Sequence, residues 1–146
     1  MKVIILDKTF KPLEFLSDYK KSLREIASNV GAESLFIGTM RDNNLKNKVL
    51  SMHLNHYPEM TKKHIEKICK SAEKKWPIVD ALVVHRVGEI LPGDAIVMVA
   101  VWAEHRHEAY EANRYIMEEL KHNAPFWKRE RLENGVQRWV KENTPA

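Results

Sequence analysis

Residues 77–104 constrain the fold most strongly, because they contain two apolar runs joined by a tight turn. The runs are PIVDALVVHRVGEI and DAIVMVAVWAE, and they meet around the tetrapeptide LPGD at 91–94. Proline second and glycine third in a tetrapeptide are typical of a type II turn. The second run is apolar at odd and even positions alike, so we expect a central strand that is covered on both faces.

Apolar spacing predicts further strands and a helix in the first third of the chain. Residues 2–6 are expected to form a short strand. The segments ESLFIGTM and KVLSMHLNHY are expected to be strands joined by the polar turn RDNNLKN. Ser17 is expected to cap a helix that runs to about Asn29. The apolar face of that helix would consist of Leu23, Ile26, Ala27 and Val30.

The remaining elements complete a mixed architecture. Pro58 suits the start of a helix that Pro77 ends, and a further helix is expected over residues 105–121. The segments FWK and VQRWV are strand-like and are separated by the turn signal Asn134-Gly135. The order predicts an α+β fold built on a largely antiparallel sheet, with a hairpin-like C-terminal end.

Length and composition favour a single domain, residues 1–146. Three further features of the sequence favour the cytoplasm. The opening MKVIIL is too short for a signal peptide, because Asp7 and Lys8 interrupt it. No apolar run approaches the ~20 residues that a membrane span needs. The single cysteine, Cys69, excludes an internal disulfide and fits a reducing compartment, and its helical context favours a buried thiol over a nucleophile.

The excess positive charge is local. Residues 121–141 contain six lysines and arginines against two glutamates, which equals the whole formal net charge of +4. The remaining basic and acidic residues cancel. This distribution indicates a site for an anion rather than a generally basic protein that binds nucleic acid.

Three segments carry candidate anion ligands, and none carries a convincing metal site. In AEHRHEAY, His105 and Arg106 fall at a helix N-terminus, where unpaired N–H groups favour an anion; a surface ion pair of Arg106 with glutamates is the alternative. FIGTMR places Arg41 at the end of a strand, which is a weak signal by itself. Zinc is disfavoured because the HExxH pattern and cysteine pairs are absent. His53 and His56 are expected to be surface or interface residues.

The stretch LKHNAPFWKRE brings two lysines to one corner. Pro125 prevents a continuous helix, so Lys121 and Lys128 belong to two elements that meet at a bend. Such a bend is either a solvated turn or a site at which two amines converge. If they converge, each disfavours the charge of the other, and one amine is then able to act as a base or nucleophile near pH 7. Phe126 and Trp127 would form a pocket wall or fill the core.

One distance limits how these groups combine. His105 and Lys121 are sixteen residues apart on one expected helix, which is about 24 Å. A small ligand can therefore hardly touch both within one chain. Either the helix is broken, or the sites are separate, or two chains share a site. We favour the last, because in a symmetric dimer one chain's His105 and Arg106 would lie beside the other chain's lysines.

Six segments, in order from about Gly31 to Val140, resemble the catalytic (large) subunit of molybdopterin synthase, the MoaE family. They are FIGTMR, LNHYPEMTKKHI, WPIVDALVVHRVGEILPGDAIV, HRHEAYEANRYIMEELK, APFWKRE and GVQRWV. The resemblance implies an α/β hammerhead-type fold and a homodimer within a heterotetramer. Each large subunit would receive a small ubiquitin-like, MoaD-like sulfur carrier with a C-terminal thiocarboxylate. Sulfur would pass to cyclic pyranopterin monophosphate and form the molybdopterin dithiolene, with no metal or other cofactor at this step.

The resemblance also implies roles for individual residues. Lys121 would be central to catalysis, with Lys128 close behind. The residues implied in substrate binding are Thr39, Met40, Arg41, His105, Arg106, Lys121, Lys128, Arg129, Glu130 and Arg138.

Two positions depart from the family pattern, and one other function stays open. Asn55 stands where the family often has glutamate, and Trp102 stands where a smaller residue is expected, so it would alter the rim of the pocket. The other function is a non-catalytic module that binds RNA or a phosphate ligand through the basic C-terminal segment. Its affinity would fall steeply with salt.

Overall fold

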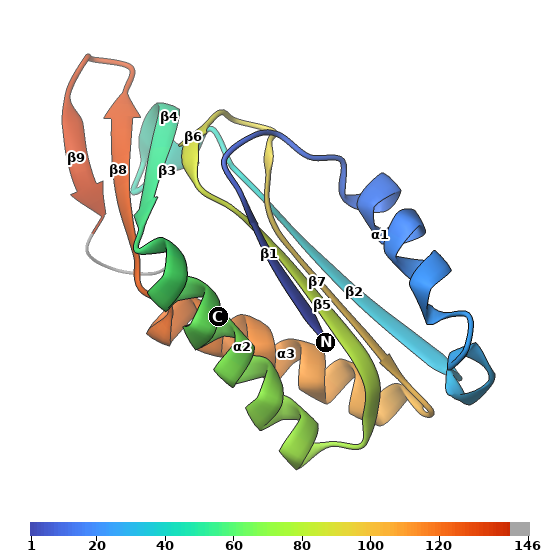
Figure 1. Ribbon diagram of the computed structural model, residues 1–146. Coiled ribbons are helices and arrows are strands. Elements are labelled where there is room, and N and C mark those ends of the chain that lie inside the picture. Colours follow the sequence, from blue (N-terminus) through green and yellow to red (C-terminus); the bar gives the residue numbers. More distant parts are fainter. Residues whose placement is uncertain (141–146) are drawn as a thin grey trace.

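The computed structural model describes residues 1–140, in which two β-sheets and three α-helices form one α+β unit (Figure 1). Lys141, which the local charge count includes, lies outside the described residues. The expected α+β class is confirmed. No helix within residues 1–140 combines the length and the apolar character needed to cross a membrane.

The larger sheet has four strands in the order β1-β5-β7-β2. These strands are β1 (Lys2–Leu6), β5 (Ile78–Arg86), β7 (Ala95–Ala103) and β2 (Ala32–Thr39). Only the β1–β5 pair is parallel, so the expectation of a largely antiparallel sheet is confirmed. Residues 97–103 of β7 are all buried, as expected for a central strand covered on both faces.

Helices cover both faces of this sheet (Figure 1). Helices α2 (Pro58–Lys75) and α3 (Arg106–Asn123) share one core with alternate side chains of β5 and β7. Helix α1 (Pro12–Lys20) and the 3₁₀ turns η1 (Lys21–Leu23) and η2 (Ala27–Asn29) cover the other side. The two longer helices lie where the sequence predicts them.

The expected helix from Ser17 to Asn29 is wrong. The α-helix begins at Pro12, and Ser17 lies in its middle. Proline at the first turn is itself a helix start signal, which the apolar pattern masked. The later apolar residues recur at a spacing of three, which 3₁₀ turns satisfy as well as an α-helix does.

The smaller sheet lies at one end of the larger one (Figure 1). It contains β3 (Asn43–Asn44), β4 (Asn47–His56), β6 (Gly88–Ile90), β8 (Phe126–Leu132) and β9 (Gln137–Val140). The hairpin-like end around Asn134-Gly135 is therefore confirmed as β8 and β9. The run PIVDALVVHRVGEI was expected to be one strand, but it breaks at Val87. Gly88, with φ of +82°, redirects the chain so that β6 pairs with β4.

Two glycines hold the ends of β7 in place. Gly93 has φ of +89°, and the Asp94 N–H donates to the Leu91 carbonyl at 3.0 Å, as the expected type II turn requires. At the other end, the Gly31 N–H donates to the Ala103 carbonyl at 3.0 Å. A Cβ on Gly31 would lie 2.2 Å from the Glu104 carbonyl oxygen, so only glycine lets β2 start this close to the corner before α3.

Candidate active site at the Pro125 corner

The two lysines lie on different elements and converge. Lys121 is in the last turn of α3, and Lys128 is the third residue of β8. Helix α3 ends at Asn123 because Ala124, which precedes Pro125, is extended with φ −71° and ψ 137°. The side chains of Lys128 and Lys121 form a hydrogen bond with each other. The bend is thus a site where two amines meet, which was one of the two alternatives.

Convergence changes the protonation of Lys128. Burial, the charge of Lys121 and the hydrogen bond with Lys121 together lower the pKa of Lys128 to about 8, and burial is the largest of these causes. Glu130 opposes the shift. Above this pKa a neutral Lys128 amine can accept a hydrogen bond from the Lys121 side chain, whereas below it most Lys128 side chains carry a proton. At neutral pH the corner therefore presents a cation beside an amine that is close to its own pKa.

His85 adjoins this pair, and the sequence reasoning missed it. Its ring stacks on Phe126 with centroids 4.2 Å apart, and its Nδ1 lies 2.8 Å from the Arg86 carbonyl oxygen. Because a carbonyl only accepts, Nδ1 carries the proton and Nε2 has the lone pair. Burial lowers the pKa of His85 to about 4, and the nearby charges of Lys128, Lys121 and His56 lower it as well. The sequence signal that could have identified His85 is a histidine within an otherwise apolar strand.

His56 also lies close to this pair, at a partly exposed position that agrees with the expectation of a surface or interface residue. It pairs with Phe126 in the β4–β8 register, and burial lowers its pKa. It also lines a groove of about 420 Å³ that follows β1. The groove is lined by Lys2, Val3, Ile4, Ile5, Asp7, His56, Pro58, Lys62 and Val87.

The two aromatic residues after Pro125 have different environments. Phe126 is partly buried and packs against two of the three apolar clusters as well as His85. Trp127 is 40% exposed and contacts Tyr57 edge to face, with ring centroids 4.7 Å apart. Asn55 pairs with Trp127 in the strand register. Phe126 therefore fills the core beside the lysines, whereas Trp127 contributes to the surface.

The segment that contains Arg41 is anchored to the turn before β7. Met40 is buried; its N–H donates to the Asp94 carbonyl and its carbonyl accepts from the Gly93 N–H, both at 2.9 Å. Thr39 and Arg41 are exposed on either side of it. Met40 therefore anchors the segment through its backbone, and Thr39 and Arg41 are the members that a ligand can reach.

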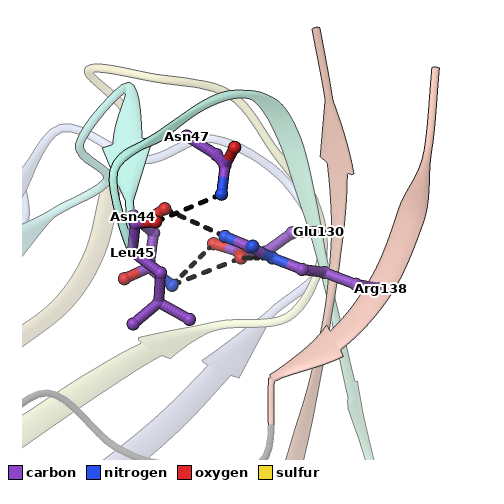
Figure 2. A network of polar contacts seen from close by, with 5 residues as sticks. All are labelled: Asn44, Leu45, Asn47, Glu130 and Arg138. Atoms are coloured by element: carbon purple, nitrogen blue, oxygen red, sulfur yellow. Dashed lines mark hydrogen bonds and ion pairs between the residues drawn. The ribbon is translucent and has the colours of Figure 1, made fainter. Parts of the chain in front are cut away.

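Glu130 and Arg138 are bonded to each other and to Asn44 (Figure 2). Arg138 Nε donates to Glu130 Oε1 at 3.0 Å, and Arg138 Nη2 donates to the Asn44 carbonyl at 2.9 Å. The Asn44 amide donates to both Glu130 oxygens at 3.1 and 3.2 Å. These charges satisfy one another within the protein, and their contact with a substrate stays a prediction.

Arg129 lies on the other face of β8. Successive strand residues point to opposite faces, so Arg129 points away from Lys128 and Glu130. Its guanidinium lies over the Trp139 ring, 5.7 Å from the centroid. It also lines a separate cavity of about 130 Å³ with Ser51 and His53. The structure therefore does not bring Arg129 to the lysine pair.

His105 and Arg106 lie at the far end of α3. His105 is the residue before the helix, Arg106 is its first residue, and both are exposed. His105 Nε2 is 3.6 Å from the Glu104 carboxylate. Because α3 is continuous to Asn123, a single chain does not bring these residues to Lys121.

Other expectations concern metals, Cys69 and Trp102. Among residues 1–140, no group of three or more histidines, cysteines and acidic residues is arranged to hold a metal ion. Burial raises the pKa of the Cys69 thiol to about 12, which confirms a buried, unreactive cysteine.

Trp102 is buried beside Tyr19 and its Nε1 donates to Glu33 at 2.6 Å. The expected change to the pocket rim is therefore wrong.

Comparisons with known proteins point to one family. The model of the family described as MoaE protein matches residues 9–123. A molybdopterin synthase catalytic subunit from Ralstonia nicotianae is 48% identical over 119 residues, which are 82% of this chain and 67% of that protein.

Two solved structures share the fold. A molybdopterin biosynthesis MoaE protein from Burkholderia ambifaria superimposes with a TM-score of 0.79 at 40% identity, covering 99% of this chain and 92% of that one. A chain from the complex of subunits 1 and 2 of molybdopterin-converting factor from Helicobacter pylori gives 0.77 at 25% identity, with 96% and 90% covered.

The lowered pKa of the partly buried Lys128 amine predicts how the stability of the fold depends on pH. Its pKa is lowered from 10.5 to about 8 on folding, so the unfolded chain binds more protons between these values. Stability of the wild type should therefore rise with pH across that window. Replacing Lys128→Met should stabilise the fold by about 1–3 kcal/mol at pH 7, and this gain should vanish as the pH rises from 8 to 10.5. Denaturant unfolding at several pH values measures it.

The matched control is Lys63→Met, which removes an exposed lysine of α2. It should change stability little at any of these pH values. A Lys128→Met variant that is no more stable than the wild type at pH 7, or whose advantage is the same at pH 10.5, contradicts the depressed pKa.

Proposed function

We infer that this chain, which belongs to the MoaE family, is the catalytic subunit of a molybdopterin synthase. The observation that carries the inference is the hydrogen-bonded pair Lys121 and Lys128, found at the corner of a chain that is 48% identical to such a subunit. The family comparisons favour this enzyme over the alternative of a module that binds RNA or a phosphate ligand. We place the reaction in the cytoplasm, in keeping with the single cysteine.

We propose that the sulfur donor is the C-terminal thiocarboxylate of a small ubiquitin-like carrier. The Helicobacter pylori relative is a complex of two subunits of molybdopterin-converting factor, which supports a small-subunit partner. The groove along β1 reaches His56, and His56 is close enough to His85 to affect its charge. An extended tail lying in that groove would have a route to the lysine pair.

The proposed acceptor is cyclic pyranopterin monophosphate, which two sulfur transfers convert to the dithiolene. Both reactants are anions, and two amines at one corner provide the matching positive charge. The carrier's sulfur would bond to the substrate carbon as the oxygen of that carbon departs as water. A water molecule would then attack the carrier's acyl carbon, so that the acyl C–S bond breaks, sulfur stays on the substrate and the carrier is released as a carboxylate. The Lys121 ammonium would stabilise the oxyanion that forms during this attack. Lys128, with a pKa of about 8, would exchange a proton with the oxygen that the substrate loses.

Replacing Lys121→Ala tests this role. Because the ammonium would be lost from the point where charge develops, molybdopterin formation should fall at least about 100-fold. The assay combines the variant with a thiocarboxylated carrier and the pterin substrate, and the product is measured by mass. Lys63→Ala, which removes an exposed lysine of α2, serves as the control.

Folding and carrier binding should be intact in the Lys121→Ala variant. Turnover equal to that of the wild type would refute a catalytic role of Lys121, whatever the behaviour of the control.

We also propose that two chains share each active site through β2. This strand is at an edge of the larger sheet, and three successive apolar side chains are exposed on it: Leu35, Phe36 and Ile37, at 38%, 42% and 36%. An exposed apolar edge strand is a ready surface for pairing with another chain. Two copies of β2 that pair antiparallel about a two-fold axis would form one continuous sheet.

The direction of β2 then accounts for the separation of the site residues. Its first residue, Ala32, pairs with Ala103, close to His105, and its last residue, Thr39, pairs with Ala95 and precedes Arg41. In the antiparallel dimer, the Ala32 end of one chain lies opposite the Thr39 end of its partner. This arrangement would bring His105 and Arg106 of one protomer to the Arg41 end of the other.

Hybrid dimers test the shared site. One protomer carries His105→Ala and Arg106→Ala, and the other carries Lys121→Ala, so each homodimer lacks a component at both sites. In a hybrid, one of the two sites would contain every group, and activity should recover up to half of the wild-type level per dimer. Purified hybrids with two different affinity tags allow the measurement. Hybrids with no more activity than either parent would exclude sharing.

A further inference from the structure

We propose that two partly buried ion pairs, Arg86–Asp94 and Glu130–Arg138, hold the segment 40–44 at its two ends and so position Arg41 at the active site. The inference rests on the proposed function in assigning Arg41 to the substrate anion. The four charged residues of the pairs are positioning residues, because they act through Arg41.

The first pair fixes the start of the segment. Arg86 is 5% exposed, and its Nη1 donates to Asp94 at 3.3 Å while Nη2 donates to the Glu89 carbonyl. The same Asp94 oxygen accepts from the Leu91 N–H at 3.0 Å, so the ion pair braces the type II turn. That turn makes two backbone hydrogen bonds to Met40, each 2.9 Å long. Arg86 thus holds Met40 through the turn.

The second pair fixes the end of the segment (Figure 2). Glu130 is 5% exposed and accepts from the amide of Asn44, while Arg138 donates to the Asn44 carbonyl. Asn44 is therefore held through both its side chain and its backbone. Glu130 is the buried partner of this pair, so removal of Arg138 would leave its charge uncompensated, and the arrangement therefore resists displacement.

We call the two ion pairs and Asn44 the clamp. The turn that follows Asn44 is strained, which is an independent reason to assign the clamp a role. Leu45 and Lys46 have φ of 49° and 65°, in the left-handed region that favours glycine or asparagine. Asn44 and Asn47 pair across this two-residue turn, and the Asn47 amide donates to the Leu45 carbonyl at 3.1 Å. Strained backbone persists only where its surroundings over-determine it, and it concentrates at functional sites.

Between these anchors the backbone has little freedom, but the Arg41 side chain is available. Only residues 41–43 separate Met40 from Asn44, and the Asp42 carbonyl accepts from the Val49 N–H at 2.8 Å. The Arg41 guanidinium is exposed and makes no hydrogen bond or ion pair with the described residues. A guanidinium on fixed backbone loses less freedom when it binds an anion than one on a mobile loop.

Glu130 also connects the clamp to the lysine pair. It lies two residues from Lys128 on the same face of β8, and its charge raises the pKa of Lys128 against the larger effects that lower it. The same carboxylate therefore influences both Arg41, through the turn, and the protonation of Lys128.

The test is Glu130→Gln, which removes the charge and keeps the size. If Glu130 positions Arg41, the KM for the pterin substrate should rise about tenfold. The kcat should change less than about threefold when each protein is assayed at its own optimal pH, because loss of the Glu130 charge also lowers the pKa of Lys128. The matched control is Asp80→Asn on β5, a buried carboxylate that accepts from the Tyr19 hydroxyl at 2.6 Å and lies outside the active site. It should leave KM unchanged. An equal KM for wild type and Glu130→Gln overturns the proposal.

A double-mutant cycle separates positioning from general destabilisation. In an Arg41→Ala background the guanidinium is absent, so Glu130→Gln should raise KM by less than about twofold further. The same tenfold rise in both backgrounds would show that Glu130 acts independently of Arg41, which also overturns the proposal. Asn44→Ala, which removes the amide from the turn instead of the buried charge, should reproduce the coupling and covers the case of a Glu130 variant that does not fold.

Hydrogen exchange gives a readout that does not depend on activity. Peptides that contain residues 40–48 should exchange faster in Asn44→Ala and Glu130→Gln than in the wild type, and Asp80→Asn should leave them unchanged. Unchanged exchange in both clamp variants contradicts the clamp itself. Faster exchange in a protein whose wild type forms no molybdopterin would support the clamp and refute the proposed function instead.

Discussion

The contact between Lys121 and Lys128 is the constraint on which the rest of the site depends. Two amines side by side repel when both are charged, and burial penalises the charge further. The two side chains are nevertheless held together by the path of the chain, because α3 ends at Asn123 and Pro125 turns the chain directly into β8. The result is a lysine with a pKa near 8, Lys128, hydrogen-bonded to a second lysine, Lys121. This arrangement suits the chemistry that we propose, in which both reactants are anions.

The two sheets position the other candidate site residues, and these residues lie at different ends of the molecule. The long central strands carry His85 to the lysine corner and end, on β7, at the His105–Arg106 corner. The smaller sheet holds Lys128 and braces the segment of Arg41 through Glu130 and Arg138. Since α3 separates its two ends by about 24 Å, the edge strand β2 becomes the element through which we propose that two chains complete one site.

Local rules predicted much of this structure. Pro125 and the LPGD turn are signals that act within a few residues, and the bend, the turn and the buried strand β7 were all confirmed. Ser17 failed as a cap because Pro12 starts the helix earlier. His85 was missed, and the position of His56 beside it was not foreseen, because both depend on strand register, which pairs His56 with Phe126 across 70 positions of sequence. The separation of Arg129 from Lys128 follows from strand alternation, once β8 is known to be a strand.

The pKa of Lys128 tests the central claim most directly. Lysine labelled at its ε-carbon reports each amine by NMR as the pH is raised, and the Lys128→Met variant identifies the signal. The account predicts that Lys128 titrates near 8 and moves toward 10.5 when Lys121 is replaced by alanine. A Lys128 amine that titrates near 10.5 in the wild type would show that Lys128 neither meets Lys121 nor is shielded from solvent.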